Sequence, residues 1–258
     1  MTMPGTSLLS AAVMLATAAA LSMAANRDVA SPTPTSTPTS TTQPIVAPVI
    51  TAAPAPGETV RVGGDRTARI SGTDGNFRAG VCNIDTPLPT GYPPPTPPQA
   101  IDLKTYPAVR AARVNGAGNP DSGKNETFWP LFNHIKKHEI AMTSPVEMNY
   151  SNLTSAPGSA PDAWSMSFLY REPDMNQPGQ EGAVIVEDTA PLTVISLGMK
   201  GDYSMKTMRE GMQQIESWLT ENPHWQPAGE WRTLYYNGPA LFFWNKWAEV
   251  QLPVKPTE

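Results

Sequence analysis

The sequence predicts an α+β fold made of two pseudo-symmetric β-β-α-β-β repeats. We expect them to form a curled antiparallel sheet or a distorted barrel with two helices packed on it. Runs of alternating apolar and polar residues, typical of strands, flank two segments that have the 3.6-residue period of an amphipathic helix. The same order of elements occurs twice, over residues 100–171 and 183–252. Such a duplication favours one sheet that carries both helices.

The first repeat contains four predicted strands, at residues 101–106, 109–114, 146–150 and 164–171. Between the second and third strands, the spacing predicts a helix over residues 128–138. Its apolar residues lie at i, i+3, i+4 and i+7 on one face: Phe128, Leu131, Phe132 and Ile135. Thr127 is the expected N-cap, which places Pro130 in the first turn, where the backbone N–H has no intrahelical partner.

The second repeat has the same organisation. Its predicted strands lie at residues 183–187, 192–199, 231–236 and 241–252. A second helix is predicted inside residues 204–221, because apolar side chains recur there at spacings of three and four residues. These are Met205, Met208, Met212, Ile215 and Leu219. Asn237-Gly238-Pro239 is a hairpin-type turn signal between the last two strands.

Three regions differ in composition along the chain. Residues 1–25 contain an uncharged Ala- and Leu-rich run that predicts a secretory signal peptide or an N-terminal membrane anchor. We therefore expect an exported protein, periplasmic or extracellular, which is tethered if this segment is uncleaved. Residues 26–98 predict a Pro- and Thr-rich linker, disordered or extended, although Leu88 and Tyr92 could dock its end on the domain. Residues 99–254 hold all seven Trp and predict the folded domain.

Charge and cysteine content exclude several classes of protein. The net charge is −5, and no basic cluster exceeds Lys136-Lys137, so nucleic acid is not an expected partner. The single Cys82 excludes an internal disulfide framework, multi-cysteine metal sites and the CxxCH haem-attachment motif. Motifs such as GxSxG, the Walker loop and GxGxxG are absent from the sequence. We therefore predict a protein that is not an enzyme.

Five segments, in this order along the chain, resemble the SOUL family of haem-binding proteins. They are a first strand at 104–110, the helix at 128–138, the turn Met142-Thr143-Ser144-Pro145-Val146, and residues 234–237 and 248–250. The resemblance covers residues 100–254. It implies a shallow hydrophobic cleft beside the first helix, which binds haem or another tetrapyrrole without catalysing a reaction on it. Haem is not expected to be essential to the fold.

A porphyrin requires a flat apolar slot and a cation for each propionate. The resemblance suggests nine cofactor-binding residues: Leu131, Phe132, Ile135, Lys136, His138, Met142, Met212, Phe243 and Lys246. The apolar members would line the slot, and the two lysines, together with Arg113, would meet carboxylates. His138 or Met142 would be an optional axial ligand. The alternative is that the apolar members form ordinary core.

Other interpretations of the sequence stay open. His134 and His138 are four residues apart on one helix and could clamp a metal ion. Without a third ligand nearby, we interpret them as helix-end residues and predict no metal site. Glu147, Tyr235 and Glu249 leave room for a small-molecule hydrolase or binding protein of the related gyrase-inhibitor-like cleft fold. A protein-interaction module without a ligand is the remaining alternative, and the oligomeric state is left open.

Overall fold

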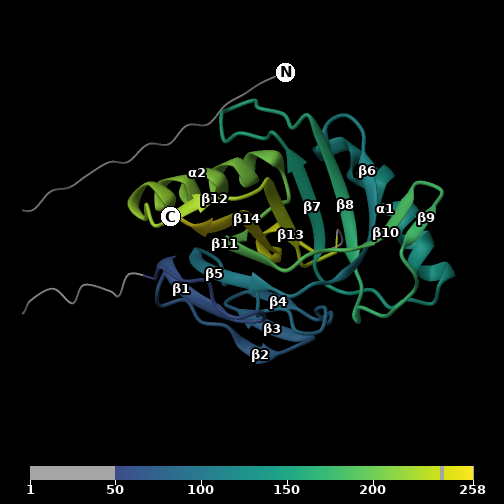
Figure 1. Cartoon of the computed structure of the whole chain (residues 1–258), viewed down its shortest axis with the longest axis horizontal. Helices are drawn as coiled ribbons and strands as arrows, with labels where there is room; N and C mark the ends of the chain where they lie inside the picture. Colours follow the sequence, from purple (N-terminus) through teal and green to yellow (C-terminus); the bar gives the residue numbers. More distant parts are fainter. Residues whose placement is uncertain (1–49, 239–240, 258) are drawn as a thin grey trace, which may run out of the picture. The chain divides into compact units, whose positions relative to one another are not determined.

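A computed structural model describes residues 50–238 and 241–257 (Figure 1). The predicted signal peptide or anchor at residues 1–25 lies outside the described residues, as does the linker up to residue 49. Neither of the two described helices has the length and apolar character needed to cross a membrane.

Eleven strands form one antiparallel sheet, and the repeat predicted from the sequence is visible in their order. The strands are β1 (Thr59–Gly64), β5 (Ala100–Tyr106), β6 (Arg110–Gly116), β7 (Val146–Ser151), β8 (Ala163–Leu169), β9 (Gly179–Glu181), β10 (Val184–Asp188), β11 (Leu192–Lys200), β12 (Trp225–Pro227), β13 (Trp231–Tyr235) and β14 (Trp247–Pro256). Their order is β1-β5-β11-β14-β13-β7-β8-β6-β10-β9, with β12 beside β14.

The two repeats are related by a pseudo-two-fold axis between β13 and β7. If β5, β6, β7 and β8 are matched with β10, β11, β13 and β14, each pairing in one repeat has its equivalent in the other. For example, β6–β8 corresponds to β11–β14, and β10–β6 corresponds to β5–β11. The sheet is curled and does not close. These findings confirm the predicted α+β class, the duplication and the curled sheet.

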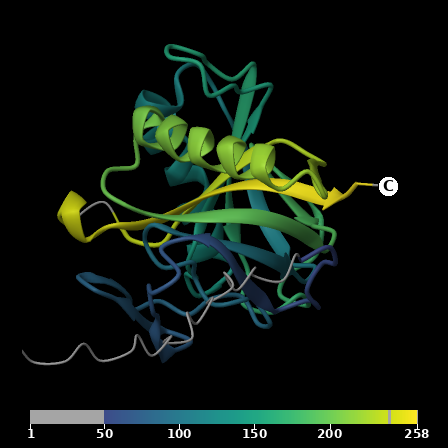
Figure 2. The ribbon, with the colours of Figure 1, turned by 90° about the vertical axis from the view of Figure 1, so that its left-hand side faces the viewer.

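Two helices pack on one face of this sheet. α1 (Pro120–Lys137) contacts β6, β8 and β10, and α2 (Met205–Glu221) contacts β11 and β14. Figure 2 shows α2 lying over the two long strands of its own repeat, β11 and β14, and running in nearly the same direction. The core beneath the helices takes alternate residues of the strands, such as Ala248, Val250 and Leu252 of β14. The residues between them face the opposite side of the sheet.

The first helix is longer than the sequence predicts. It begins at Pro120, and its N-cap is Asn119, whose side chain accepts a hydrogen bond from the backbone N–H of Asp121. Pro at N1 and an Asn cap are a usual helix start. We predicted Thr127 as the cap because the first two turns are polar and lack an apolar period. Gly123 in these turns lies against the Trp164 ring. This close contact holds the first two turns on the domain although they have no apolar stripe.

The predicted linker over residues 26–98 is corrected for its described part. β1 pairs with β5, and a separate three-stranded sheet follows: β2 (Ser71–Thr73), β3 (Asn76–Ala79) and β4 (Cys82–Ile84). The Pro-rich segment after it docks on the domain, as Leu88 is buried and the Tyr92 ring contacts the Tyr106 ring at 4.7 Å. A few scattered apolar residues are enough to order this region, because they pack against the face of the main sheet opposite the helices.

Candidate functional site

The outer face of α1 carries exposed aromatic side chains. Trp129 is 56% exposed and Phe132 is 36% exposed, although large aromatic side chains are mostly buried in folded domains. Their rings meet edge to face with centroids 5.8 Å apart, and Phe128 stacks on Phe132 at 5.9 Å. Phe128 also contacts Phe168 of β8, which joins the group to the core. We refer to Phe128, Trp129 and Phe132 as the aromatic platform.

Lys136 adds a positive charge beside the aromatic platform. It follows Phe132 by four residues and Trp129 by seven, so the three side chains leave the same face of the helix. Lys136 is exposed. A flat apolar ring stacked on one of the two exposed aromatics and touching the edge of the other would therefore have a cation on the same helix face for an acidic substituent.

The structure does not gather the nine predicted residues into one slot. Leu131, Ile135 and Met212 are buried in the core beneath the helices, and Met142 packs against the same core. A ring inserted here would have to displace these side chains. These four residues therefore match the ordinary-core alternative, whereas the other two apolar members, Phe132 and Phe243, are exposed.

The predicted residues of the last strand lie on the other repeat. Phe243 belongs to the 3₁₀ helix η1 (Phe243–Asn245), which contacts β11, whereas α1 contacts β6, β8 and β10. The side chain of Phe243 is exposed, and Nζ of Lys246 lies 5.1 Å from the ring centroid of Tyr203. The strand that we predicted from residue 241 begins only at Trp247. Arg113 pairs with Glu187 at 2.6 Å.

Two hollows of several hundred Å³ lie on the described surface, and none of the nine predicted residues lines either of them. One, of about 550 Å³, lies between the small sheet, β11 and α2, and its walls include Arg69, Val81, Met199 and Lys200. The other, of about 600 Å³, lies beside Trp218 of α2. Both involve elements before residue 99 that the sequence did not assign to the domain.

The face of the sheet opposite the helices is buried, and it carries a group of polar side chains beside its apolar ones. Nζ of Lys104 donates to Oε1 of Glu249 at 2.9 Å, and neither side chain is exposed. The hydroxyls of Ser196 and Tyr236 donate to the same carboxylate at 2.6 and 2.8 Å. Burial raises the pKa of Glu249, but the charge of Lys104 and these hydrogen bonds outweigh it, so the pKa lies below its usual value.

The docked segment before β5 covers this polar face. The backbone N–H of Thr96 donates to Oε1 of Glu249 at 2.6 Å, and the carbonyl oxygen of Pro94 accepts from Nζ of Lys104 at 2.8 Å. Nε1 of Trp247 donates to the carbonyl oxygen of Thr96 at 2.7 Å. The docked segment thus fills the space through which a ligand would have to approach Glu249.

The residues considered for hydrolysis do not meet. Glu147 pairs with Arg232 at 3.0 Å on the polar face. Tyr235 faces the opposite side, where its ring stacks on Tyr203 at 4.2 Å and packs into the core beneath the helices. Glu249 therefore has the sheet between itself and Tyr235, and the three residues form no common pocket.

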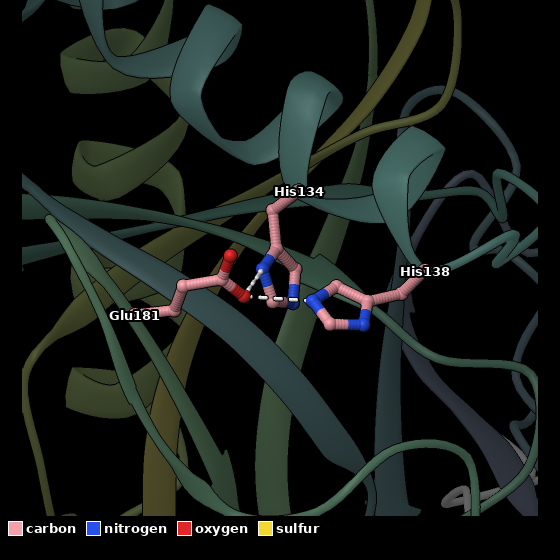
Figure 3. Close-up of side chains that lie close together, drawn as sticks. All are labelled: His134, His138 and Glu181. Carbon is pink, nitrogen blue, oxygen red and sulfur yellow. Dashed lines mark hydrogen bonds and ion pairs between the residues drawn. The ribbon is translucent and has the colours of Figure 1, made fainter.

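A cluster of His134, His138 and Glu181 lies at the C-terminal end of α1 (Figure 3). Nε2 of His138 lies 2.7 Å from Oε2 of Glu181, and Nδ1 of His134 lies 3.2 Å from the same oxygen. Hydrogen bonds from Lys137 and His138 lower the pKa of Glu181 to about 2. Burial, followed by the charge of His138, lowers the pKa of His134.

Comparison with known proteins places the fold. A sequence model described as the SOUL heme-binding protein family matches residues 93–253, more than half of the chain. The chain belongs to this family. No curated protein matches the SOUL chain at a significant level. The resemblance inferred from the Met142–Val146 turn and the surrounding segments is confirmed.

Solved structures resemble the SOUL domain in fold alone. The C-terminal domain of EcmrR is 16% identical, with a TM-score of 0.51, and the alignment covers 61% of this chain and 98% of that one. A hydrolase from Listeria innocua is 14% identical with a TM-score of 0.46, covering 63% and 94% of the two chains. At such identities these similarities carry no ligand or activity to the SOUL protein.

Two residues of interest were missed in the sequence. Trp129 lies on the polar face of its helix, and a large aromatic residue at such a position indicates a candidate binding surface. Glu181 lies 43 residues after His138 in the short strand β9, outside both repeats as predicted. Only the pairing of β9 with β10, and of β10 with β6, brings it back to α1.

Proposed function

We propose that this SOUL domain binds haem, or a similarly flat amphiphile, on the aromatic platform of α1 without catalysing a reaction on it. The ring would stack on the face of one of these two perpendicular rings, Trp129 or Phe132, and contact the edge of the other, and one carboxylate would meet Lys136. The observation that carries the proposal is the exposure of these two aromatic side chains on the helix that the family match includes. Burying such rings under a ligand is favourable, because stacking adds about 0.5–1.5 kcal/mol per pair to the apolar contact.

The fit of the residues favours a ring on the surface over an inserted one. Leu131 and Ile135, on the inner face of α1, are packed in the core, and interiors this dense do not admit a guest without rearrangement. A ring on the outer face displaces nothing. Of the nine predicted residues, Phe132 and Lys136 keep their proposed role, and Trp129 joins them.

The location of the protein is part of the same proposal. The Ala- and Leu-rich run in residues 8–25 supports export. The protein would then carry or buffer its ligand in the periplasm or outside the cell, held by a membrane anchor if the run is uncleaved. No nucleic-acid partner is proposed, because the chain carries a net charge of −5.

The proposal is tested by titrating the full chain with haemin and following Soret absorbance. The wild type should saturate at one equivalent, and Trp129→Ala/Phe132→Ala should bind at least about tenfold more weakly, a loss of about 1.4 kcal/mol. The matched control is Phe243→Ala/Trp244→Ala, which removes two other exposed aromatics. Uptake without saturation, or equal loss in the control, would contradict the proposal.

A second candidate is an interaction module, and one observation favours it. Phe242, Phe243 and Trp244 form an exposed apolar patch, with the rings of Phe242 and Trp244 stacked at 4.8 Å. Exposed apolar patches mark association sites. This candidate predicts that haemin does not saturate the protein, and that self-association or partner binding is lost in Phe242→Ser/Trp244→Ser.

A further inference from the structure

Three donor atoms from two elements converge beside the end of α1. His134 and His138 lie one turn apart, with ring centroids at 4.5 Å, and Glu181 reaches them from β9. One ligand atom of each residue lies within 4.8 Å of the others. Around a tetrahedral ion with bonds of about 2.0–2.1 Å, ligand atoms are separated by ~3.3 Å. The 3.2 Å between Nδ1 of His134 and Oε2 of Glu181 is close to this value, and the 2.7 Å between Nε2 of His138 and the same oxygen is the shorter distance of a direct hydrogen bond.

His134 gives an independent indication of a ligand. Its side chain is 3% exposed, yet Nδ1 makes no hydrogen bond with the described residues, although it lies 3.2 Å from Oε2 of Glu181. An unpaired buried nitrogen is costly. Nε2 of the same ring is 2.9 Å from the hydroxyl of Tyr170. A metal-bound imidazole usually has its second nitrogen held by such a partner.

The surroundings leave a path for an ion and set its charge balance. His138 and Glu181 are partly exposed, so solvent reaches the side of the cluster away from His134. Lys137 pairs with Oε1 of Glu181, whereas both histidines face Oε2. Oε2 is thus the carboxylate oxygen that could share a cation with the two histidines, although the charge of Lys137 opposes cation binding.

We propose that Nδ1 of His134, Nε2 of His138 and Oε2 of Glu181 bind one divalent transition-metal ion such as Zn²⁺. Two imidazoles and one carboxylate suit Zn²⁺ and its neighbours, whereas Mg²⁺ and Ca²⁺ prefer oxygen ligands. Three protein ligands leave a coordination position for water. From the sequence alone we predict no metal site, because the third ligand, Glu181, lies outside the predicted repeats.

This metal site is separate from the proposed haem surface. At about 100° per residue, His134 and His138 lie on roughly the opposite side of α1 from Trp129 and Lys136. A metal ion in the cluster and a ring on the aromatic platform therefore need not compete. Each proposal can fail without the other.

The test is calorimetric titration of the full chain with ZnCl₂ after removal of metals with a chelator. The wild type should bind one Zn²⁺. His138→Ala and Glu181→Gln should each weaken binding by at least about 100-fold, because losing even an outer-shell partner costs about 10–100-fold in metal affinity. These two side chains are partly exposed, so both variants should fold. His224→Ala is the matched control, because it removes the remaining histidine, which lies in an exposed loop.

Lys137→Gln sharpens the test in the opposite direction. Removing this charge should strengthen Zn²⁺ binding several-fold if the ion sits beside Glu181. The proposal is overturned if the wild type binds no Zn²⁺, if His138→Ala and Glu181→Gln bind as the wild type does, or if His224→Ala abolishes binding. Because haemin is absent, the result does not depend on the proposed haem surface.

Discussion

Lys104 and Glu249 form a fully buried ion pair across β11, with Nζ of the lysine 2.9 Å from Oε1 of the glutamate. Lysine and glutamate are almost never fully buried unless paired. The pair lies between the main sheet and the segment that docks on it, because Pro94 and Thr96 complete its hydrogen bonds. It therefore links the folding of the domain to the docking of residues 86–98.

Lys104→Met should destabilise the protein by about 3–5 kcal/mol, since it leaves Glu249 charged and without its partner in the interior. The double variant Lys104→Met/Glu249→Gln should recover most of this loss. Urea unfolding of the three proteins checks the prediction. Glu187→Gln, which breaks a partly exposed pair with Arg113, is the control and should change stability by no more than about 1 kcal/mol. Similar effects of Lys104→Met and the control would show that the buried pair is unimportant.

Stability should fall in acid through Glu249. Its pKa in the folded protein lies below the ordinary 4.5, so the carboxylate stabilises the fold above that pH. This contribution is lost as the pH falls below about 4.5 and through the folded-state value. Unfolding free energies between about pH 6 and about pH 3 should drop more steeply for the wild type than for Lys104→Met/Glu249→Gln. Parallel curves would rule out this source of acid sensitivity.

Gly198→Ala should loosen the docked segment. A Cβ at Gly198 would lie 2.1 Å from the carbonyl oxygen of Pro97 and 2.3 Å from that of Thr96. The segment would have to move, at a cost of about 1–3 kcal/mol. Hydrogen exchange at the Thr96 amide should accelerate. Gly238→Ala is the matched control, because nothing lies within 4 Å of its Cβ. Unchanged exchange at Thr96 would contradict the tight contact.

Truncation to residues 99–258, the domain boundary that the sequence suggested, should yield an unstable protein. It removes β1 and exposes the face formed by Tyr106, Val194, Leu234 and Trp247, which Phe77, Ile84 and Leu88 now cover. Exposed apolar surface of this kind promotes aggregation. Light scattering and urea unfolding should separate it from a chain that starts at residue 48. A monomeric truncated domain of equal stability would show that the cover is dispensable.

The main sheet was predictable because its strands alternate clearly between apolar and polar residues, and the apolar residues face the helices. Ile101, Leu103, Ile195 and Leu197 all pack beneath the helices, and such alternation predicts strands. The polar residues between them, such as Lys104, Ser196 and Glu249, face the other side of the sheet and are also buried. Nothing in the local pattern shows that Lys104 and Glu249 lie on strands separated only by β11 and are covered by a Pro-rich segment, because that burial depends on long-range pairing.

The candidate sites were predictable only in part. Phe132 and Lys136 were found through the helix and the family resemblance, whereas Leu131 and Ile135 were indistinguishable from slot residues by spacing. Both kinds of residue repeat every three to four positions, and only the packing of α1 on β6 and β8 decides which side faces the core. His134 and His138 were noticed but lacked Glu181, whose position depends on the β9–β10 pairing.

Amide NMR spectra recorded during haemin addition test the central proposal most directly, because paramagnetic iron broadens the signals of nearby residues. The proposal predicts that signals around Trp129, Phe132 and Lys136 broaden first and reach completion at one equivalent. Signals of Val81 and Met199 in the hollow beside the small sheet, and of Phe243, should persist. Broadening that begins at those residues and spares α1 would contradict the proposed binding surface.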